Sequence, residues 1–283
     1  MFINRNLFIV SGIFIINCFS NLNATAQNEN FVKPVNKAFD KGLVALKLGD
    51  TLQAYQYIQT AQVFSDHPQE VDYYFHVLSL RLGKPNAEQN AKIWMAENKN
   101  RIYFSKISYA LGHYYFNQQK DEEAINAFSN VSIDDLDNND IVTMKFLEGY
   151  IYFKSGNWDK AAPLLNAVRQ VNSNEHYAAA NYYAGFISLQ KKSFQDALKY
   201  FQIAAQSKFY IKLTPFYISQ LYYFLGDIDA AMSHCEKALA AGGQFYELQL
   251  NQLMGHLLFE KKEYNKALPY LSNYVSKQKK VDP

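Results

Sequence analysis

The chain has 283 residues, with 28 Lys and Arg against 26 Asp and Glu and a formal net charge of +2. Apolar residues make up 49% of it, which can offset the entropy of ordering the chain and excludes wholesale disorder. The small net charge argues against a protein held to nucleic acid by phosphate neutralisation, and two cysteines exclude a disulfide-stapled scaffold. The unusual quantity is the aromatic content of 16%, made of 22 Tyr, 21 Phe and 2 Trp.

The first 26 residues have the order of a secretory signal peptide. A positive start precedes an apolar run over residues 7–16, and a small-x-small triplet follows at residues 24–26. The run is shorter than the ~20 residues that a membrane-spanning helix needs, so cleavage after Ala26 is favoured over a retained anchor. Cys18 raises lipidation as an alternative, which is disfavoured because Asn17 stands where a lipoprotein motif has a small residue. The sequence predicts an exported protein, periplasmic or associated with the outer membrane.

The rest of the chain repeats one motif. An alanine recurs every 33 to 37 residues, at Ala54, Ala91, Ala124, Ala161, Ala197, Ala231 and Ala267. A small residue stands twelve positions before each alanine, at Gly42, Ser79, Gly112, Gly149, Gly185, Ser219 and Gly255. Two markers that keep one phase with a period near 34 residues indicate stacked supersecondary units.

Each repeat is predicted to form two helices. Large apolar residues recur at three- and four-residue spacing on both sides of short polar turns such as Gly49-Asp50 and Gly226-Asp227. A turn glycine suits a left-handed residue, and the following Asp suits a helix N-cap. Glycine inside a helix costs about 1 kcal/mol relative to alanine, so the recurrent glycine of the first helix predicts a close helix–helix approach. Pro163 and Pro269 are placed in the opening turn of second helices, where proline is tolerated.

These motifs resemble the tetratricopeptide repeat. The match includes the small residue, the alanine, an aromatic three residues after the small one (Tyr115, Tyr152, Tyr222), and a large apolar residue four after the alanine (Ile58, Phe128, Leu165, Phe201, Leu271). The family's early tryptophan is absent. The resemblance implies an all-α, right-handed solenoid of about seven antiparallel helix pairs. The Asn-, Tyr- and Phe-rich composition, together with the signal segment, is similar to exported repeat proteins of Bacteroidetes type.

The predicted organisation has three parts. The signal peptide covers residues 1–26, a short linker covers 27–34, and the solenoid covers 35–281. The seven units are expected at about 35–68, 72–104, 105–138, 142–175, 178–211, 212–245 and 248–281. The second unit is the most degenerate, because it keeps only Ala91 and a weak first helix.

No catalytic or metal motif stands out, and none of the six histidines has a partner at metal-ligand spacing on its helix face. The acidic segment 134–140 alternates like a calcium loop, but Asp140 replaces the needed glycine and Phe146 the bidentate glutamate. It is therefore predicted to be a loop that caps the next helix. Cys235 falls at the large apolar site of its second helix and is predicted to be buried. We expect no enzyme activity, no cofactor and no metal.

The resemblance also implies a binding face. In this family the concave face is built by first helices, and inward side chains lie three before, one after and four after the small residue. In the third to sixth units the aromatic and histidine residues at these phases are Tyr109, His113, Phe116, Phe146, Tyr150, Phe153, Tyr182, Phe186, Phe216 and Tyr223. The alternative is that these rings pack between helices and expose only their edges. The basic set by which some members clamp a C-terminal carboxylate is missing, since Thr143, Ala179 and Leu213 stand at one of its phases.

The leading functional hypothesis is a non-enzymatic envelope scaffold that binds a protein or peptide in an aromatic groove, for example in secretion, motility or outer-membrane assembly. Two alternatives are the N-terminal sensor segment of a longer signalling kinase and a glycan-binding envelope protein. Neither a nucleic acid partner nor a stable transmembrane segment is expected. The last unit has no capping helix, which predicts continuation past Pro283 or cover by a partner or second copy over Tyr270, Leu271, Tyr274 and Val275.

Overall fold

The computed structural model describes residues 34–63, 68–98 and 100–278. The predicted signal peptide, its alternative lipidation site at Cys18 and residues 27–33 of the linker lie outside these ranges. Within them the secondary structure is entirely helical, with fourteen α-helices, two short 3₁₀ helices and no strand. The chain divides into two compact units, one ending at Asp140 and the other beginning at Ile141. No helix in the described ranges is long and apolar enough to cross a bilayer.

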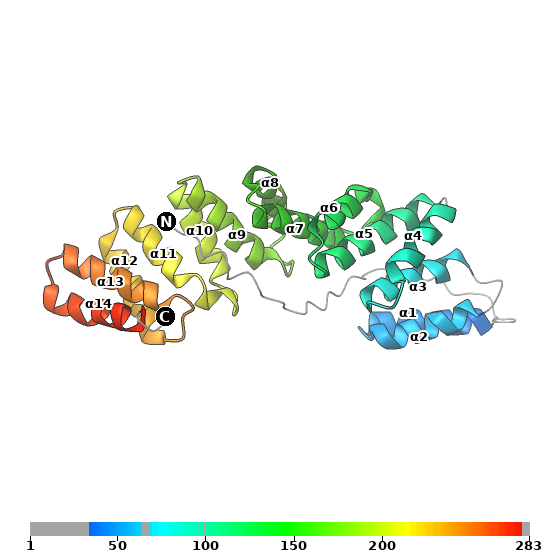
Figure 1. Ribbon diagram of the computed structural model, residues 1–283, viewed down its shortest axis with the longest axis horizontal. Helices are drawn as coiled ribbons and strands as arrows, with labels where there is room; N and C mark the ends of the chain where they lie inside the picture. Colours follow the sequence, from blue (N-terminus) through cyan, green and yellow to red (C-terminus); the bar gives the residue numbers. More distant parts are fainter. Residues whose placement is uncertain (1–33, 64–67, 99, 279–283) are drawn as a thin grey trace. The chain divides into compact units, whose positions relative to one another are not determined.

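The helices follow one another as the seven expected pairs, so the predicted all-helical repeat fold is confirmed (Figure 1). The first three pairs are α1 (Pro34–Lys47) with α2 (Thr51–Gln62), α3 (Gln69–Arg81) with α4 (Ala87–Glu97), and α5 (Arg101–Asn117) with α6 (Asp121–Ser129). The remaining pairs are α7 (Asn138–Lys154) with α8 (Trp158–Val168), α9 (Tyr177–Gln190) with α10 (Phe194–Ala204), α11 (Pro215–Phe224) with α12 (Ile228–Ala241), and α13 (Glu247–Glu260) with α14 (Tyr264–Gln278). The 3₁₀ helices η1 (Ile133–Asp135) and η2 (Tyr210–Lys212) precede α7 and α11.

In five of the first helices a glycine faces the large apolar residue sixteen positions later. A Cβ added at Gly112 would lie 2.2 Å from the Phe128 ring, and one at Gly185 would lie 3.0 Å from the Phe201 ring. The same contact joins Gly42 to Ile58, Gly149 to Leu165 and Gly255 to Leu271. Real Cβ atoms essentially never approach closer than about 3 Å, so these glycines allow the helices to pack. The predicted close approach is confirmed, and we call this contact the seam.

The turns inside three of the pairs follow the prediction as well. Gly49, Gly156 and Gly226 have φ of 79°, 78° and 81°, a backbone region that glycine adopts without a steric penalty. The next residues, Asp50, Asn157 and Asp227, accept a hydrogen bond from the backbone N–H three residues on. At the equivalent turn positions of other pairs, Gln119, Lys192 and Lys262 adopt positive φ without being glycine.

The prediction for two prolines is wrong. Pro163 and Pro269 lie inside α8 and α14, past the opening turn, because these helices begin directly after the turn, at Trp158 and Tyr264. Each proline therefore removes one helical hydrogen bond. Both are exposed, so water can reach the carbonyl group that loses its partner. Pro215, by contrast, occupies the first turn of α11 as expected.

The thiol of Cys235 is buried as predicted. Burial raises the pKa of this thiol to about 11, so it stays protonated at neutral pH. It belongs to an apolar cluster with Ala231 and Leu257, formed between α12 and α13. Cys235 is therefore a packing residue and a poor nucleophile.

Candidate partner-binding face

The first helices of the second unit carry a row of contacting rings. Tyr183 of α9 lies at its centre, with ring centroids 5.1 Å from Tyr150 and 4.9 Å from Phe153 of α7. Phe146 stacks on His176, the N-cap of α9, at 4.2 Å and an interplanar angle of 6°. These contacts join the first helices of two successive repeats through side chains.

The row continues from α9 to α11. Phe186 contacts Tyr217 at 4.7 Å, and Tyr217 contacts Tyr246 at 5.1 Å. Phe186 also packs edge-on against the seam residue Phe201 at 5.1 Å, so the row contacts the hydrophobic core at this residue. Tyr246 is the N-cap of α13 and comes from the loop between repeats. We define the ring row as Phe146, Tyr150, Phe153, Tyr183, Phe186, Tyr217 and Tyr246.

Two hydroxyl groups of the ring row, those of Tyr183 and Tyr217, are uncharged at physiological pH. Burial raises the pKa of Tyr183 and of Tyr217 above the ordinary value of 10. The neighbouring Tyr210 adds to the rise at Tyr183, and the neighbouring Tyr246 adds to the rise at Tyr217. These two side chains therefore offer apolar area and neutral hydrogen-bonding groups.

The structure places the ten predicted groove residues in two environments. Tyr109 and Tyr182 are buried, with 7% and 8% of their surface exposed. The other eight, at His113, Phe116, Phe146, Tyr150, Phe153, Phe186, Phe216 and Tyr223, are half-buried. Tyr109 donates a hydrogen bond to Asp140 at 3.1 Å, and its ring packs on His113 and Phe128. Tyr109 and Tyr182 are thus packing residues, which leaves eight candidates for direct contact.

Four tyrosines near these candidates were not predicted as site residues. Tyr183 and Tyr217 both stand two positions before the small residue of their repeat, and this shared phase was the signal available in the sequence. Tyr210 and Tyr246 lie in loops between repeats, where no helical periodicity marks them. Their ring contacts with Tyr182 and Tyr217 bring them to the first helices.

Tyr223 of α11 forms polar contacts with two residues of α13. The hydroxyl of Tyr223 donates to Glu260 at 2.9 Å and lies 3.2 Å from the Nε2 of His256. His256 and Glu260 are 3.1 Å apart on α13. His256 is exposed, so the series of aromatic contacts ends here at a residue that can form hydrogen bonds.

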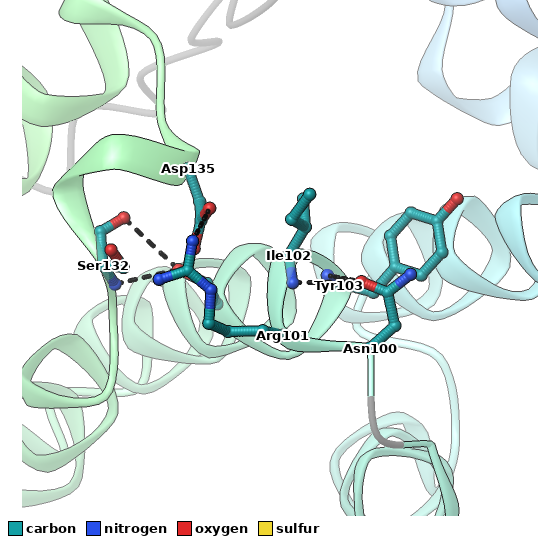
Figure 2. Close-up of polar contacts among 7 residues, drawn as sticks. Asn100, Arg101, Ile102, Tyr103, Ser132 and Asp135 are labelled. Carbon is teal, nitrogen blue, oxygen red and sulfur yellow. Dashed lines mark hydrogen bonds and ion pairs between the residues drawn. The ribbon is translucent and has the colours of Figure 1, made fainter.

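The acidic segment before α7 is used for contacts within the first unit. Asp135 pairs with Arg101 at 3.4 Å, and Asn100 caps α5 through Ile102 and Tyr103 (Figure 2). The carboxylate of Asp137 accepts from the backbone N–H of Asp140 at 2.8 Å, which confirms the predicted capping role of this loop. The ranges that the structure describes contain no group of three or more side chains suited to a metal ion.

Two segments match a known family. Residues 146–210 and residues 218–241 each match the tetratricopeptide repeat. Both segments are tetratricopeptide repeats. The first match contains most of the ring row, and neither match is to a catalytic domain. No curated protein sequence matches the chain.

Solved structures of low sequence identity share the fold. The apo form of RapI superposes with a TM-score of 0.62 at 16% identity, covering 89% of this chain and 78% of RapI. The MamA protein gives a TM-score of 0.52 at 20% identity, covering 62% of this chain and 93% of MamA. A tetratricopeptide repeat protein from Parabacteroides merdae gives 0.48 at 16% identity, covering 86% and 93% of the two chains. At these identities the likeness concerns the fold alone.

Proposed function

We propose that this chain is a tetratricopeptide repeat protein that acts as a non-enzymatic scaffold of the cell envelope and holds a protein or peptide partner against the ring row. The observation that carries the proposal is the run of half-buried rings across α7, α9 and α11. Aromatic side chains supply large contact area at low entropic cost, and interface hot spots are enriched in them. Export rests on the signal-peptide pattern of the first 26 residues, and a role in secretion, motility or outer-membrane assembly rests on the resemblance to exported repeat proteins.

The partner is best matched by an extended peptide or a helix with apolar side chains. The hydroxyl groups of Tyr183 and Tyr217 are neutral, so these two rings do not themselves select an acidic or a basic ligand. The rings from α9 to the loop before α13 meet at steep angles, 77° between Phe186 and Tyr217 and 74° between Tyr217 and Tyr246, so they partly cover one another's faces. Such a surface accepts inserted side chains, whereas stacking of a sugar needs an open ring face.

A site-specific crosslink tests this proposal. A photoreactive benzoylphenylalanine replaces Phe153, a half-buried member of the ring row, and cells are irradiated before the envelope is extracted. The matched control carries the same group at Tyr200, which lies on second helix α10 against Arg169. We expect one crosslinked protein from position 153 and none from position 200.

A second variant separates contact from stability. Tyr150→Ala removes a half-buried ring that no seam contact uses, so helicity should stay unchanged while the crosslink at position 153 weakens. Equal crosslinking from positions 153 and 200, or full crosslinking with Tyr150→Ala, would contradict binding at the ring row. Capture of an isolated glycan in place of a protein would favour the glycan-binding alternative.

A further inference from the structure

Two neighbouring loops of the second unit expose large apolar side chains. The loop between α10 and α11 presents Phe209 and Ile211, which are 46% and 53% exposed. The loop between α12 and α13 presents Phe245, which is 62% exposed. The two loops are in contact, because the backbone N–H of Phe245 donates to the carbonyl of Lys212 at 3.1 Å. The three side chains therefore belong to one region of the surface.

Each loop is held in place by the residue next to its exposed ring. Tyr210 lies between Phe209 and Ile211 and packs on Tyr182 at 4.7 Å. Tyr246 follows Phe245 and packs on Phe216 at 5.8 Å. One aromatic thus points inward as an anchor while its neighbour stays in solvent. Single exposed apolar residues are common on proteins, but apolar tips on anchored, contacting loops form a defined surface.

The charged residues of these two loops are all positive. Residues 205–214 contain Lys208 and Lys212 and no acidic residue, and residues 242–246 carry no charge. The nearest acid in the sequence, Glu247, lies 3.7 Å from Lys277 of α14. The loop between α8 and α9 is different, because it exposes Glu175 and presents only Val171 as a large apolar residue.

We propose that Lys208, Phe209, Ile211, Lys212 and Phe245 form a docking surface for an anionic lipid bilayer, which we call the loop patch. Aromatic and aliphatic tips enter the boundary between headgroups and acyl chains, while the lysines pair with anionic headgroups. An anionic bilayer is the partner that suits both the apolar tips and the lysines. The loop patch shares no residue with the ring row, which it adjoins at Phe245 and Tyr246, so the protein would hold a peptide partner next to a membrane surface.

Vesicle binding tests the proposal directly. The protein is made as residues 27–283, which keep every described residue and omit the apolar run at 7–16 that would itself bind lipid. It is sedimented with vesicles of mixed phosphatidylcholine and phosphatidylglycerol, and with vesicles of phosphatidylcholine alone. We expect binding to the anionic vesicles that decreases with salt, because salt screens the attraction between the lysines and the anionic headgroups.

Two pairs of variants assign this binding to the loop patch. Phe209→Ser with Phe245→Ser removes the tips, and its control, Phe224→Ser with Phe259→Ser, removes two exposed rings from α11 and α13. Lys208→Glu with Lys212→Glu reverses the charge, and its control, Lys199→Glu with Lys237→Glu, reverses exposed lysines on α10 and α12. We expect each loop-patch variant to lose about tenfold or more in partitioning, with both controls near wild type.

A fluorescence measurement detects insertion of the tips. In Phe245→Trp the added indole should shift to shorter wavelength when anionic vesicles are present, whereas in Phe259→Trp it should not. The proposal is overturned if the wild type does not partition, if controls and loop-patch variants lose binding equally, or if the indole at position 245 stays in water. It is also overturned if light scattering shows a dimer that Phe209→Ser with Phe245→Ser dissociates, since a second copy would then cover the loop patch.

Discussion

The helix pairs α5–α6 and α11–α12 have the same fold but different residues at two positions, the seam and the turn. In α5–α6 the seam has Gly112 against the large ring of Phe128, and the turn has Gln119 at a φ of 60°. In α11–α12 the seam has Ser219 with Cys235 sixteen residues on, and the turn has Gly226 at 81°. The seam with the larger small residue thus has a smaller partner, while the turn keeps a backbone angle. These are separate requirements that each repeat meets on its own.

The largest expected effect comes from adding one methyl group at the tighter seam. Gly112→Ala places a Cβ 2.2 Å from Phe128, so the ring or the helices must move, and we expect a loss of about 3 kcal/mol. The matched change, Ser219→Ala, removes only a hydroxyl that donates to Pro215 and contacts His234, and should cost about 1 kcal/mol. Hydrogen exchange followed by mass spectrometry resolves each pair separately. Equal losses in the two pairs would contradict the size difference between the seams.

Compensating substitutions test whether the two residues of a seam compete for the same space. Phe128→Leu should recover about 1–2 kcal/mol in the Gly112→Ala background although it destabilises the otherwise unchanged protein. In the other pair, Cys235→Leu should overpack against Ser219, and Ser219→Gly should relieve it. A double-mutant cycle on urea unfolding measures both couplings. Strictly additive effects would mean that neither pair of residues is in contact.

The sequence predicted the seam well because its two partners lie within one repeat. A spacing of sixteen residues across a short turn is fixed by helix geometry, so Gly185 and Phe201 could be matched from their phases alone. The ring row was predicted less completely, since its contacts depend on how one repeat rotates against the next. Tyr183 and Tyr217 lie one residue from a predicted phase, and Tyr246 reaches the row from a loop.

The second repeat shows the same limit. Its motif is weak, yet α3 and α4 form, with Ala91 fully buried. Its small residue, Ser79, is also buried. Aromatic contacts to the following repeat hold it in place, such as Tyr73 stacked on Tyr103 at 5.2 Å. The motif of a single repeat carries no information about its contacts with the next repeat.

Acidification tests the serine seam, because Ser219 contacts His234, a buried histidine with a lowered pKa. Burial lowers the pKa of His234 below 6.5, with a further contribution from Lys237. The folded protein then binds a proton less readily than the unfolded chain. The stability contributed by neutral His234 is present above about pH 6.5 and is lost as the pH falls below it. His234→Gln should reduce the pH dependence of urea unfolding between about pH 7.5 and 5.5, and an unchanged dependence would contradict this assignment.

The smallest effects concern the turns, where the two pairs should respond with opposite signs. Gln119→Gly removes a side chain from a left-handed position, where a non-glycine residue costs roughly 1 kcal/mol, and should stabilise α5–α6 by about that amount or less. Gly226→Ala introduces the same penalty into α11–α12 and should destabilise it by about 1 kcal/mol. No atom lies within 4 Å of a Cβ added at Gly226, so this change reports backbone conformation without a clash. Urea unfolding of the two variants, with hydrogen exchange to locate the change, checks both signs. A loss of stability with Gln119→Gly would show that the glutamine side chain stabilises its turn by more than the backbone strain costs.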